Sequence, residues 1–301
     1  MKTLLSSVGI VFCAALPVLA DTLTLTPSAD TTLFQNFPDN NLGGVTMLAA
    51  GTTAHGFLTR ALIKFDVAGQ IPPGSTVTSA RLRVTVSRAP LGAQPSTFSL
   101  RRVLRDWGEG DKSVGTLGDV ATEGEANWTY RFYDVASWQT PGGAPGVDFS
   151  NTSSSSAPSA TGGTMLFNTS VQMVADVQSW LQNPGQNFGW LVISGSEQLL
   201  STARRLASRE DPNSAPALEI QYAPPFRIDN VALSDGSFHF SFHVEPLFTY
   251  TVESRTFLGT GTWGTLTNFS ERLSSYEATI SDPATGPSRF YRVLKAPCNC
   301  P

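Results

Sequence analysis

The chain has 301 residues, of which 41% are hydrophobic and 15% are charged, and its formal net charge is −4. The hydrophobic content is that of a globular protein, and the low charge together with 26 Gly and 20 Pro favours many short strands joined by turns. Because phosphate binding requires a cationic surface, the acidic balance argues against nucleic acid as the main partner.

The first twenty residues have the pattern of a secretion signal. Lys2 precedes an apolar run at residues 4–16, and Val18-Leu19-Ala20 supplies the small-residue ending that signal peptidase needs. The run is shorter than the roughly 20 residues of a membrane-spanning helix. We therefore predict a signal peptide at residues 1–20 and a secreted protein, extracellular or on the cell surface, without membrane insertion.

Two cysteines follow the predicted cleavage site, Cys298 and Cys300, in a tail at residues 297–301. Export permits disulfides, but two cysteines at one end of a chain cannot staple a fold. Three interpretations stay open: incidental thiols, crosslinking between tails, and a metal or redox role.

Alternation of apolar and polar residues dominates after residue 20, as expected for half-buried strands. Leu82, Val84 and Val86 share one face of such a segment, and Arg81 and Arg83 lie on the other. Strands are expected at residues 22–26, 58–66, 81–86, 97–104, 188–194 and 217–222.

Two segments depart from this alternation. Residues 170–181 have helical spacing, with Ser170 as a cap and Asn183-Pro184-Gly185 as a stop, and predict a short helix over one end of a sandwich. Residues 108–160 are rich in Gly, Ser and aromatic residues and poorly periodic, which predicts a long loop that is either functional or disordered, mobile at residues 151–159.

Ala223-Pro224-Pro225 is the clearest domain boundary. A second series of short strands follows it and suits a small immunoglobulin-like or fibronectin-like sandwich at residues 224–296. These strands are expected at residues 227–233, 237–244, 248–254, 264–268, 276–280 and 289–294.

Many short segments, in order and spacing, follow one family pattern: Ala29-Asp30-Thr31, Asn40-Asn41-Leu42-Gly43, the runs at 60–66 and 71–82, Asp106-Trp107, Ser179-Trp180-Leu181, Asn187-Phe188-Gly189-Trp190, Ala207-Ser208-Arg209-Glu210 and Pro216-Ala217-Leu218. Through these segments most of residues 25–223 resembles the bacterial DNRLRE domain. The resemblance implies an all-β, jelly-roll-like β-sandwich at residues 21–223, of a kind found in secreted and surface proteins, and some relatives are grouped with alginate-binding carbohydrate modules. The long Gly-rich insertion departs from the simplest members.

The second domain resembles a small C-terminal module of secreted bacterial proteins. The segments that carry this resemblance are residues 248–254 and the ending at residues 288–293. It implies an accessory immunoglobulin-like sandwich.

No strong catalytic motif is present. Asp106, Glu109 and Asp111 follow Trp107, and paired carboxylates are what glycoside hydrolysis requires. Acidic loops also commonly solvate a turn. Residues 205–210 invite a lyase interpretation, but the arginine, glutamine–histidine and tyrosine–lysine motifs of lyases are not matched, and Arg209-Glu210 is interpreted as a structural ion pair beside the last strand. An enzyme that degrades polysaccharides is therefore kept as the last alternative.

Sugar binding requires aromatic faces for stacking and charged groups for hydroxyls or carboxylates. The loop aromatics either form such a platform or cap one end of the sandwich. The arginines would form a basic strip if their strands are neighbours, and otherwise are scattered surface charges. The candidate ligand-binding residues are Trp107, Trp128, Tyr130, Tyr133 and Trp138, with Arg81, Arg83, Arg101 and Arg105.

Metal sites are less clearly indicated. Asp30 and Asp66 are candidates for a structural calcium ion, since oxygen ligands suit that cation, and no other cofactor is predicted. His239 and His243 lie four apart in a strand pattern and share a face, which indicates either a solvated face or a metal site. His55 is expected in an exposed turn.

Together these patterns predict a secreted, non-catalytic protein that binds a polysaccharide or a cell-surface glycan, or that serves surface attachment. A structural or adhesive spacer protein is the alternative.

Overall fold

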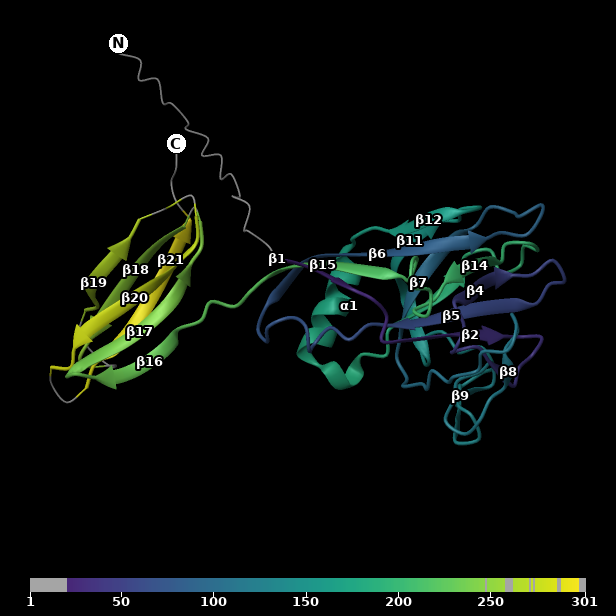
Figure 1. The fold of residues 1–301 in the computed structure, drawn as a ribbon, viewed down its shortest axis with the longest axis horizontal. Helices are drawn as coiled ribbons and strands as arrows, with labels where there is room; N and C mark the ends of the chain where they lie inside the picture. Colours follow the sequence, from purple (N-terminus) through teal and green to yellow (C-terminus); the bar gives the residue numbers. More distant parts are fainter. Residues whose placement is uncertain are drawn as a thin grey trace, which may run out of the picture. The chain divides into compact units, whose positions relative to one another are not determined.

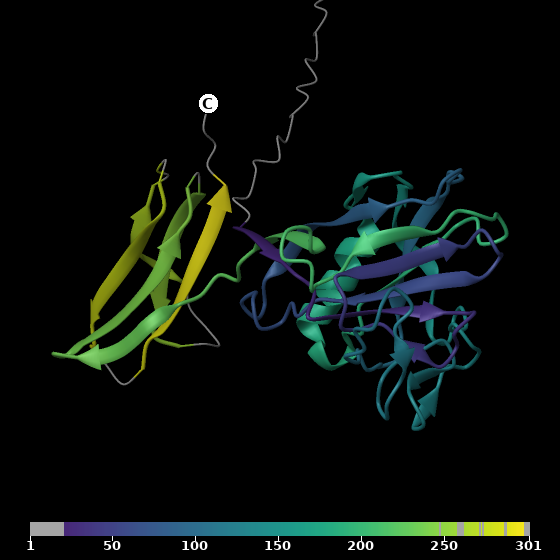
Figure 2. The same cartoon turned by 45° about the vertical axis from the view of Figure 1, so that its right-hand side comes forward.

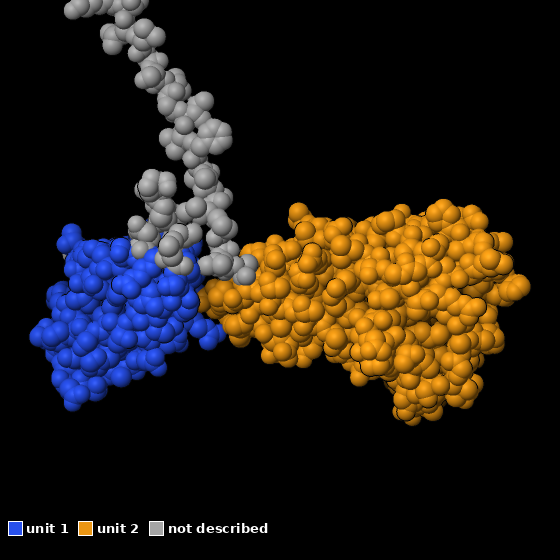
Figure 3. Space-filling view, turned by 45° about the horizontal axis from the view of Figure 1, so that its top comes forward, with its two compact units in different colours: residues 1–19, 226–301 blue, residues 20–225 orange. Residues whose placement is uncertain are grey.

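The computed structural model describes residues 21–246, 248–257, 262–270, 272, 274–285 and 288–297. The predicted signal peptide and both tail cysteines lie outside these residues. The chain divides into two compact units directly after Pro225, the end of the proline-containing segment (Figure 3). In chain order we term the part that ends at Pro225, orange and labelled unit 2 in Figure 3, the first unit, and the part that begins at Phe226, blue and labelled unit 1, the second unit. No helix among the described residues is long and apolar enough to cross a membrane.

The first unit is an antiparallel β-sandwich, as the alternating pattern predicted (Figures 1 and 2). Its strands are β1 (Asp21–Leu25), β2 (Ala29–Phe34), β3 (Asn40–Asn41), β4 (Met47–Thr52), β5 (Leu58–Lys64), β6 (Thr76–Arg88), β7 (Thr97–Val103), β8 (Asp119–Val120), β9 (Tyr130–Phe132), β10 (Ala136–Ser137), β11 (Phe149–Pro158), β12 (Gly163–Phe167), β13 (Trp190–Ser194), β14 (Arg204–Ala207) and β15 (Ala217–Ala223).

Two layers of strands form the sandwich. In the first sheet β1, β15, β6, β14 and β4 follow one another, and β12 pairs with β6. In the second sheet the order is β2, β5, β13, β7 and β11. β4 joins the layers, because Ala49 and Ala50 pair with β14 while Gly51 and Thr52 pair with β5. β6 and β7 therefore lie in different sheets, and residues 81 and 83 are not neighbours of residue 101.

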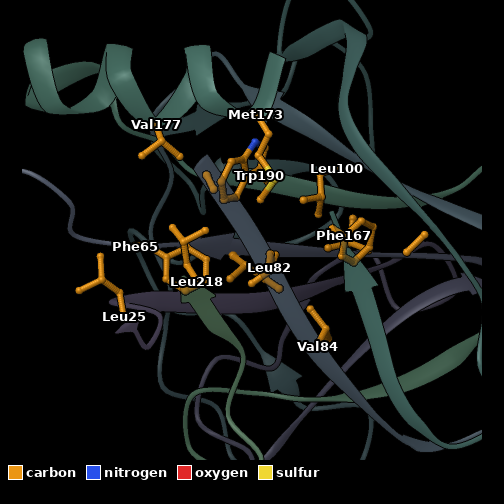
Figure 4. Close-up of a cluster of buried hydrophobic side chains, with 14 of the residues drawn as sticks. Leu25, Phe65, Leu82, Val84, Leu100, Phe167, Met173, Val177, Trp190 and Leu218 are labelled. Atoms are coloured by element: carbon orange, nitrogen blue, oxygen red, sulfur yellow. The ribbon is translucent and has the colours of Figure 1, made fainter. Parts of the chain in front are cut away.

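Apolar side chains from both sheets and from one helix fill the space between the layers (Figure 4). The helix α1 (Val171–Gln182) begins at Ser170 as predicted, where the Ser170 hydroxyl accepts a 3.0 Å hydrogen bond from the Met173 N–H. A short 3-10 turn, η1 (Pro184–Gln186), follows it. Trp180 and Trp190 are fully buried and meet edge to face with ring centroids 4.5 Å apart.

One carboxylate lies within this core. Asp176 is fully buried on α1, where Oδ2 accepts from the Ser154 hydroxyl at 2.5 Å and from the Trp190 indole at 3.2 Å. Oδ1 accepts from the Gln172 amide and lies 3.8 Å from the Arg102 guanidinium. Since a buried carboxylate is tolerated only when it is hydrogen-bonded, this network fixes α1 against β11 and β13.

β11 corrects the prediction of a mobile segment at residues 151–159. Its serines satisfy one another and their surroundings: Ser156 bonds Ser99 at 3.1 Å, and Ser155 donates to the Asn168 carbonyl at 2.7 Å. Ala157 faces the core. Several inward positions of β11 are serines whose hydroxyl groups form hydrogen bonds, so the spacing of hydrophobic residues does not reveal this strand.

The insertion at residues 104–148, between β7 and β11, lies beside β2 and bears β8 and β9 (Figures 1 and 2). It covers the outer face of the second sheet and forms a second core there. β2 is consequently buried along nearly its whole length. The members of this second core are Leu33, Leu62, Val103, Trp107, Ala126, Trp128, Trp138, Phe149 and Leu191.

The second unit contains two three-stranded sheets, β16-β17-β20 and β19-β18-β21, around an aromatic core. Phe240, Phe242 and Val244 alternate inward along β17, and His239 and His243 lie on its other face. Its strands are β16 (Asp229–Ser234), β17 (Ser237–Val244), β18 (Phe248–Arg255), β19 (Gly264–Phe269), β20 (Tyr276–Pro283) and β21 (Phe290–Pro297).

The Asp176 network yields a stability prediction. Asp176→Ala leaves the half-buried Arg102 guanidinium without its carboxylate and removes an acceptor from the buried Trp190 indole and the buried Ser154 hydroxyl, so we expect a loss of about 3 kcal/mol in the free energy of unfolding. Urea denaturation followed by tryptophan fluorescence measures it. Asp66→Ala removes an exposed aspartate and should change stability by less than about 0.5 kcal/mol. Equal stability of the two variants would contradict the structural role of Asp176.

Candidate functional site

Asn41 connects the insertion to the sandwich. Its side chain is fully buried, and Nδ2 donates to the Glu109 carbonyl at 2.6 Å and to the Ala126 carbonyl at 2.8 Å. Gly43 lies beside Glu109 so closely that an added Cβ would come within 2.5 Å of the Glu109 carbonyl oxygen. The Asn40-Asn41-Leu42-Gly43 turn thus holds the root of the insertion.

The three loop indoles are buried under this insertion. The exposed fractions of Trp107, Trp128 and Trp138 are 6%, 7% and 5%. The indole N–H of Trp107 donates to the Phe188 carbonyl, and that of Trp138 to the Asn127 carbonyl. None of the three offers an open ring face, so the structure places them as the cap of the sandwich, which was the other interpretation of these residues.

The two loop tyrosines are half-buried and contact each other. The ring centroids of Tyr130 and Tyr133 are 5.4 Å apart in an edge-to-face arrangement. They do not join the indoles in a common platform.

The four candidate arginines do not form a strip. Arg81 pairs with Glu219 at 2.8 Å on the first sheet, where Arg83 is also exposed. Arg101 lies in the second sheet and donates to the Asn151 carbonyl. Arg105 lines a polar hollow of about 350 Å³ in the insertion, together with Arg131 and Trp138. The condition for a basic strip is not met, because the strands at 81–86 and 98–104 belong to opposite layers, and the alternative of scattered arginines applies.

A different set of arginines lines a pocket that we term the arginine pocket. Its volume is about 440 Å³, and residues of β4, β6 and β14 line it together with residues of β2, β5 and the loops between strands. It is lined by Phe34, Asn36, Met47, Ala49, Thr53, Ala54, Thr59, Arg88, Ala89, Pro90, Leu91, Thr116, Leu117, Ala203, Arg204 and Arg205.

Strand register explains why these side chains converge. Arg205 on β14 pairs with Ala49 on β4 and with Arg88 on β6, and directly opposed residues point to the same face of a sheet. A register shift beside Arg205 turns Arg88 outward, although Val86 two residues earlier is buried. The bulge therefore places Arg88 and Arg205 opposite each other on the same face of the sheet.

The pocket is cationic in an acidic protein. Among its described lining residues three are arginines and none is Asp or Glu. Arg88 and Arg205 form no ion pair with a described residue. The third, Arg204, is buried and donates to the carbonyls of Ala160, Thr202 and Gln94 rather than to a carboxylate. Its charge is thus not neutralised by an acidic partner.

Apolar groups complete the pocket. Phe34 is buried and Met47 is half-buried at its lining, and Leu91 and Leu117 are exposed around it. Such a lining suits a ligand with apolar C–H faces and anionic groups, such as an acidic sugar.

A second cluster of charges lies at the root of the insertion. Carboxylate oxygens of Asp30, Glu109 and Glu210, one from each, lie within 4.8 Å of one another, and we term these residues the carboxylate cluster. Asp30 is fully buried, its Oδ2 accepts a 2.7 Å hydrogen bond from the Arg209 N–H, and its Oδ1 has no hydrogen-bond partner among the described residues. Burial raises the pKa of Asp30 to about 8 and also raises the pKa of Glu109.

Arg209 lies among these carboxylates. Its guanidinium pairs with Glu109 at 2.9 Å and with Glu210 at 3.2 Å. The sequence correctly indicated an ion pair between Arg209 and Glu210, but Glu109 belongs to it as well.

The remaining acidic and histidine candidates lie elsewhere. Asp66 is exposed and outside the carboxylate cluster, so the expected pairing of Asp30 with Asp66 is not formed. Asp106 and Asp111 are exposed and do not join Glu109. Within the described residues His239 and His243 do not belong to any group of three close metal-ligating side chains, and His243 pairs with Glu277 at 3.0 Å. His55 lies in an exposed turn as predicted.

Sequence reasoning missed Arg88 and Arg205 as site residues. Both end or interrupt an alternating segment, and their convergence depends on a bulge and on pairing between residues more than a hundred positions apart. The one sequence signal was the Arg204-Arg205 pair within a strand-like run, which is uncommon because adjacent side chains face opposite sides of a sheet.

Substitution of Gly118 tests the close contact between the insertion and Asn41 near the arginine pocket. Gly118 and Gly115 both have positive φ, 68° and 60°, but a Cβ at Gly118 would lie 1.7 Å from the Asn41 carbonyl oxygen, whereas one at Gly115 meets nothing within 4 Å. Gly115→Ala should lower the free energy of unfolding by the roughly 1–2 kcal/mol of left-handed backbone strain, and Gly118→Ala by clearly more. Urea denaturation of both variants compares them, and equal losses would refute the close approach at Asn41.

Comparison with known protein families matches residues 21–112 to carbohydrate-binding module family 96. The matched segment is well under half of the chain, and it includes β1 to β7 and the pocket residues Phe34, Met47 and Arg88. A search of curated proteins found none that matches. The first unit therefore contains a segment similar to a carbohydrate-binding module, which indicates glycan binding and points to a binding module rather than a catalytic domain.

Proposed function

We propose that the protein is a secreted, non-catalytic polysaccharide-binding protein that holds an acidic glycan in the arginine pocket. The observation that carries this proposal is the pocket itself, in which three arginines and no acidic residue line about 440 Å³ on a module similar to carbohydrate-binding family 96. The signal-like residues 1–20 support an extracellular place of action, where such polymers occur.

Charge favours an anionic ligand. A guanidinium binds a carboxylate in a bidentate geometry, and such bonds are roughly twice as strong as those between neutral groups. With no described acidic partner nearby, Arg88 and Arg205 are free to bind a uronate without first breaking an ion pair. The overall charge of −4 would repel a polyanion elsewhere on the surface and so direct it to this pocket.

The pocket lining favours a sugar over a small inorganic anion. Met47, Ala49 and Phe34 provide apolar surface for the C–H face of a pyranose, and the volume lies within the range of small-molecule sites. Asn36 and Thr53 also line the pocket and can bond hydroxyl groups. Leu91 and Leu117 can then contact the neighbouring sugar units of a polymer.

Affinity electrophoresis of the secreted form tests the proposal. We expect alginate and pectin in the gel to retard residues 21–301, xylan to have little effect, and added salt to weaken the retardation. The double variant Arg88→Ala/Arg205→Ala should lose at least about tenfold in affinity, because each charge-assisted bond contributes about 1.5–3 kcal/mol.

Arg83→Ala is the matched control. It removes one positive charge from an exposed position on the same strand as Arg88 but outside the arginine pocket, and it should leave the retardation nearly unchanged. Undiminished retardation of the double variant would refute the pocket as the binding site. Unchanged mobility of the wild type in all gels would instead favour the spacer alternative.

A further inference from the structure

We propose that Asp30, Glu109 and Glu210 bind one divalent cation of the calcium class, and that this ion joins the insertion to the loop after β14. The proposal goes beyond glycan binding, since it assigns a metal site to residues outside the arginine pocket. Three observations carry it: the spacing of the oxygens, the unpartnered atom of Asp30 and the charge of the cluster.

The spacing fits a single ion. Calcium takes oxygen ligands at about 2.3–2.6 Å, so two ligands of one ion lie at most about 5 Å apart. The three carboxylate oxygens lie within 4.8 Å of one another. The cluster contains only oxygen donors and no His or Cys, which favours a hard cation over zinc or copper.

The unpartnered oxygen is the second observation. Asp30 is fully buried at the start of β2, and its Oδ1 has no hydrogen-bond partner among the described residues although Oδ2 is bonded. Buried polar atoms nearly always have a partner, and those without one often mark a place for a water or an ion. A cation between the carboxylates would satisfy this oxygen.

The balance of charge is the third observation. Three carboxylates face one guanidinium, that of Arg209, which bonds Glu109 and Glu210 but reaches Asp30 only through its backbone N–H. Ionised, the group keeps a charge of −2. A divalent cation would balance this excess when all three carboxylates are ionised.

The site joins two segments that each contribute residues to the arginine pocket. Glu109 precedes the part of the insertion that bears Leu117, and Glu210 follows β14, which bears Arg205. Both segments contact β2 at Asp30, whose N–H donates to Glu109 at 2.7 Å and whose carboxylate accepts from the Arg209 N–H. An ion here would hold both segments to β2.

Calcium titration of residues 21–301, without any polysaccharide, tests the site. After treatment with a chelator the wild type should bind one calcium ion per chain by isothermal titration calorimetry, and about 10 mM calcium should raise the Tm of the first unit by several degrees. Asp30→Asn keeps the size of the side chain and should weaken calcium binding at least about thirtyfold. Glu210→Gln provides a second, more exposed variant with the same expected loss.

Asp66→Asn is the matched control, because it neutralises an exposed aspartate outside the cluster and should bind calcium as the wild type does. Absence of saturable binding in the wild type, or equal affinity in Asp30→Asn and Glu210→Gln, would overturn the proposal. These outcomes do not depend on whether the arginine pocket binds a glycan, since no glycan is present and neither Arg88 nor Arg205 is changed.

Discussion

The amide of Asn41 is the interaction on which the arrangement of the first unit depends. It is fully buried, and its single NH₂ group reaches carbonyls of Glu109 and Ala126 while its oxygen accepts from the Gly43 N–H at 2.9 Å. These partners lie in two separate parts of the insertion and in the turn before β4. A buried amide needs hydrogen-bond partners. The side chain of Asn41 has its partners only when the turn and the insertion are both in place.

The consequences extend to both candidate sites. With its root fixed, the insertion covers the outer face of the second sheet, buries Trp128 and Trp138, and brings Glu109 to Asp30. Further along the same insertion, Leu117 reaches the arginine pocket. A segment that sequence composition describes as a glycine-rich loop is thus a compact layer with a hydrophobic core of its own.

The sequence predicted most of what depends on local pattern. Alternation located β1, β5, β7 and β15 nearly to the residue, and helical spacing with Ser170 located α1, because one-sided burial leaves a periodic trace in the chain. β11 was missed because its buried positions are serines, and no hydrophobic period marks them. Burial by hydroxyl pairing is invisible to a hydrophobicity pattern.

The site was harder to predict, since it depends on which strands become neighbours. Arg81 and Arg101 share similar alternating segments, yet those segments lie in opposite sheets, whereas Arg88 and Arg205 come from distant parts of the chain and meet through a bulge. The prediction of an aromatic platform failed for a related reason. Composition shows that the tryptophans lie between strands, but only the tertiary structure shows that this segment packs against the sheet and buries them. Asp30 was recognised as a metal candidate, but its partners Glu109 and Glu210 required the fold.

Separation of charge links the two sites physically. The acidic residues of the insertion root gather around Asp30 and Arg209, while the lining of the arginine pocket contains no acidic side chain among the described residues. Arg209 pairs with two members of the carboxylate cluster, whereas Arg205, four residues earlier on β14, has no acidic partner among the described residues. One short segment therefore carries an arginine with a structural role and the arginine for which we propose a role in binding, and the presence or absence of an acidic partner distinguishes the two.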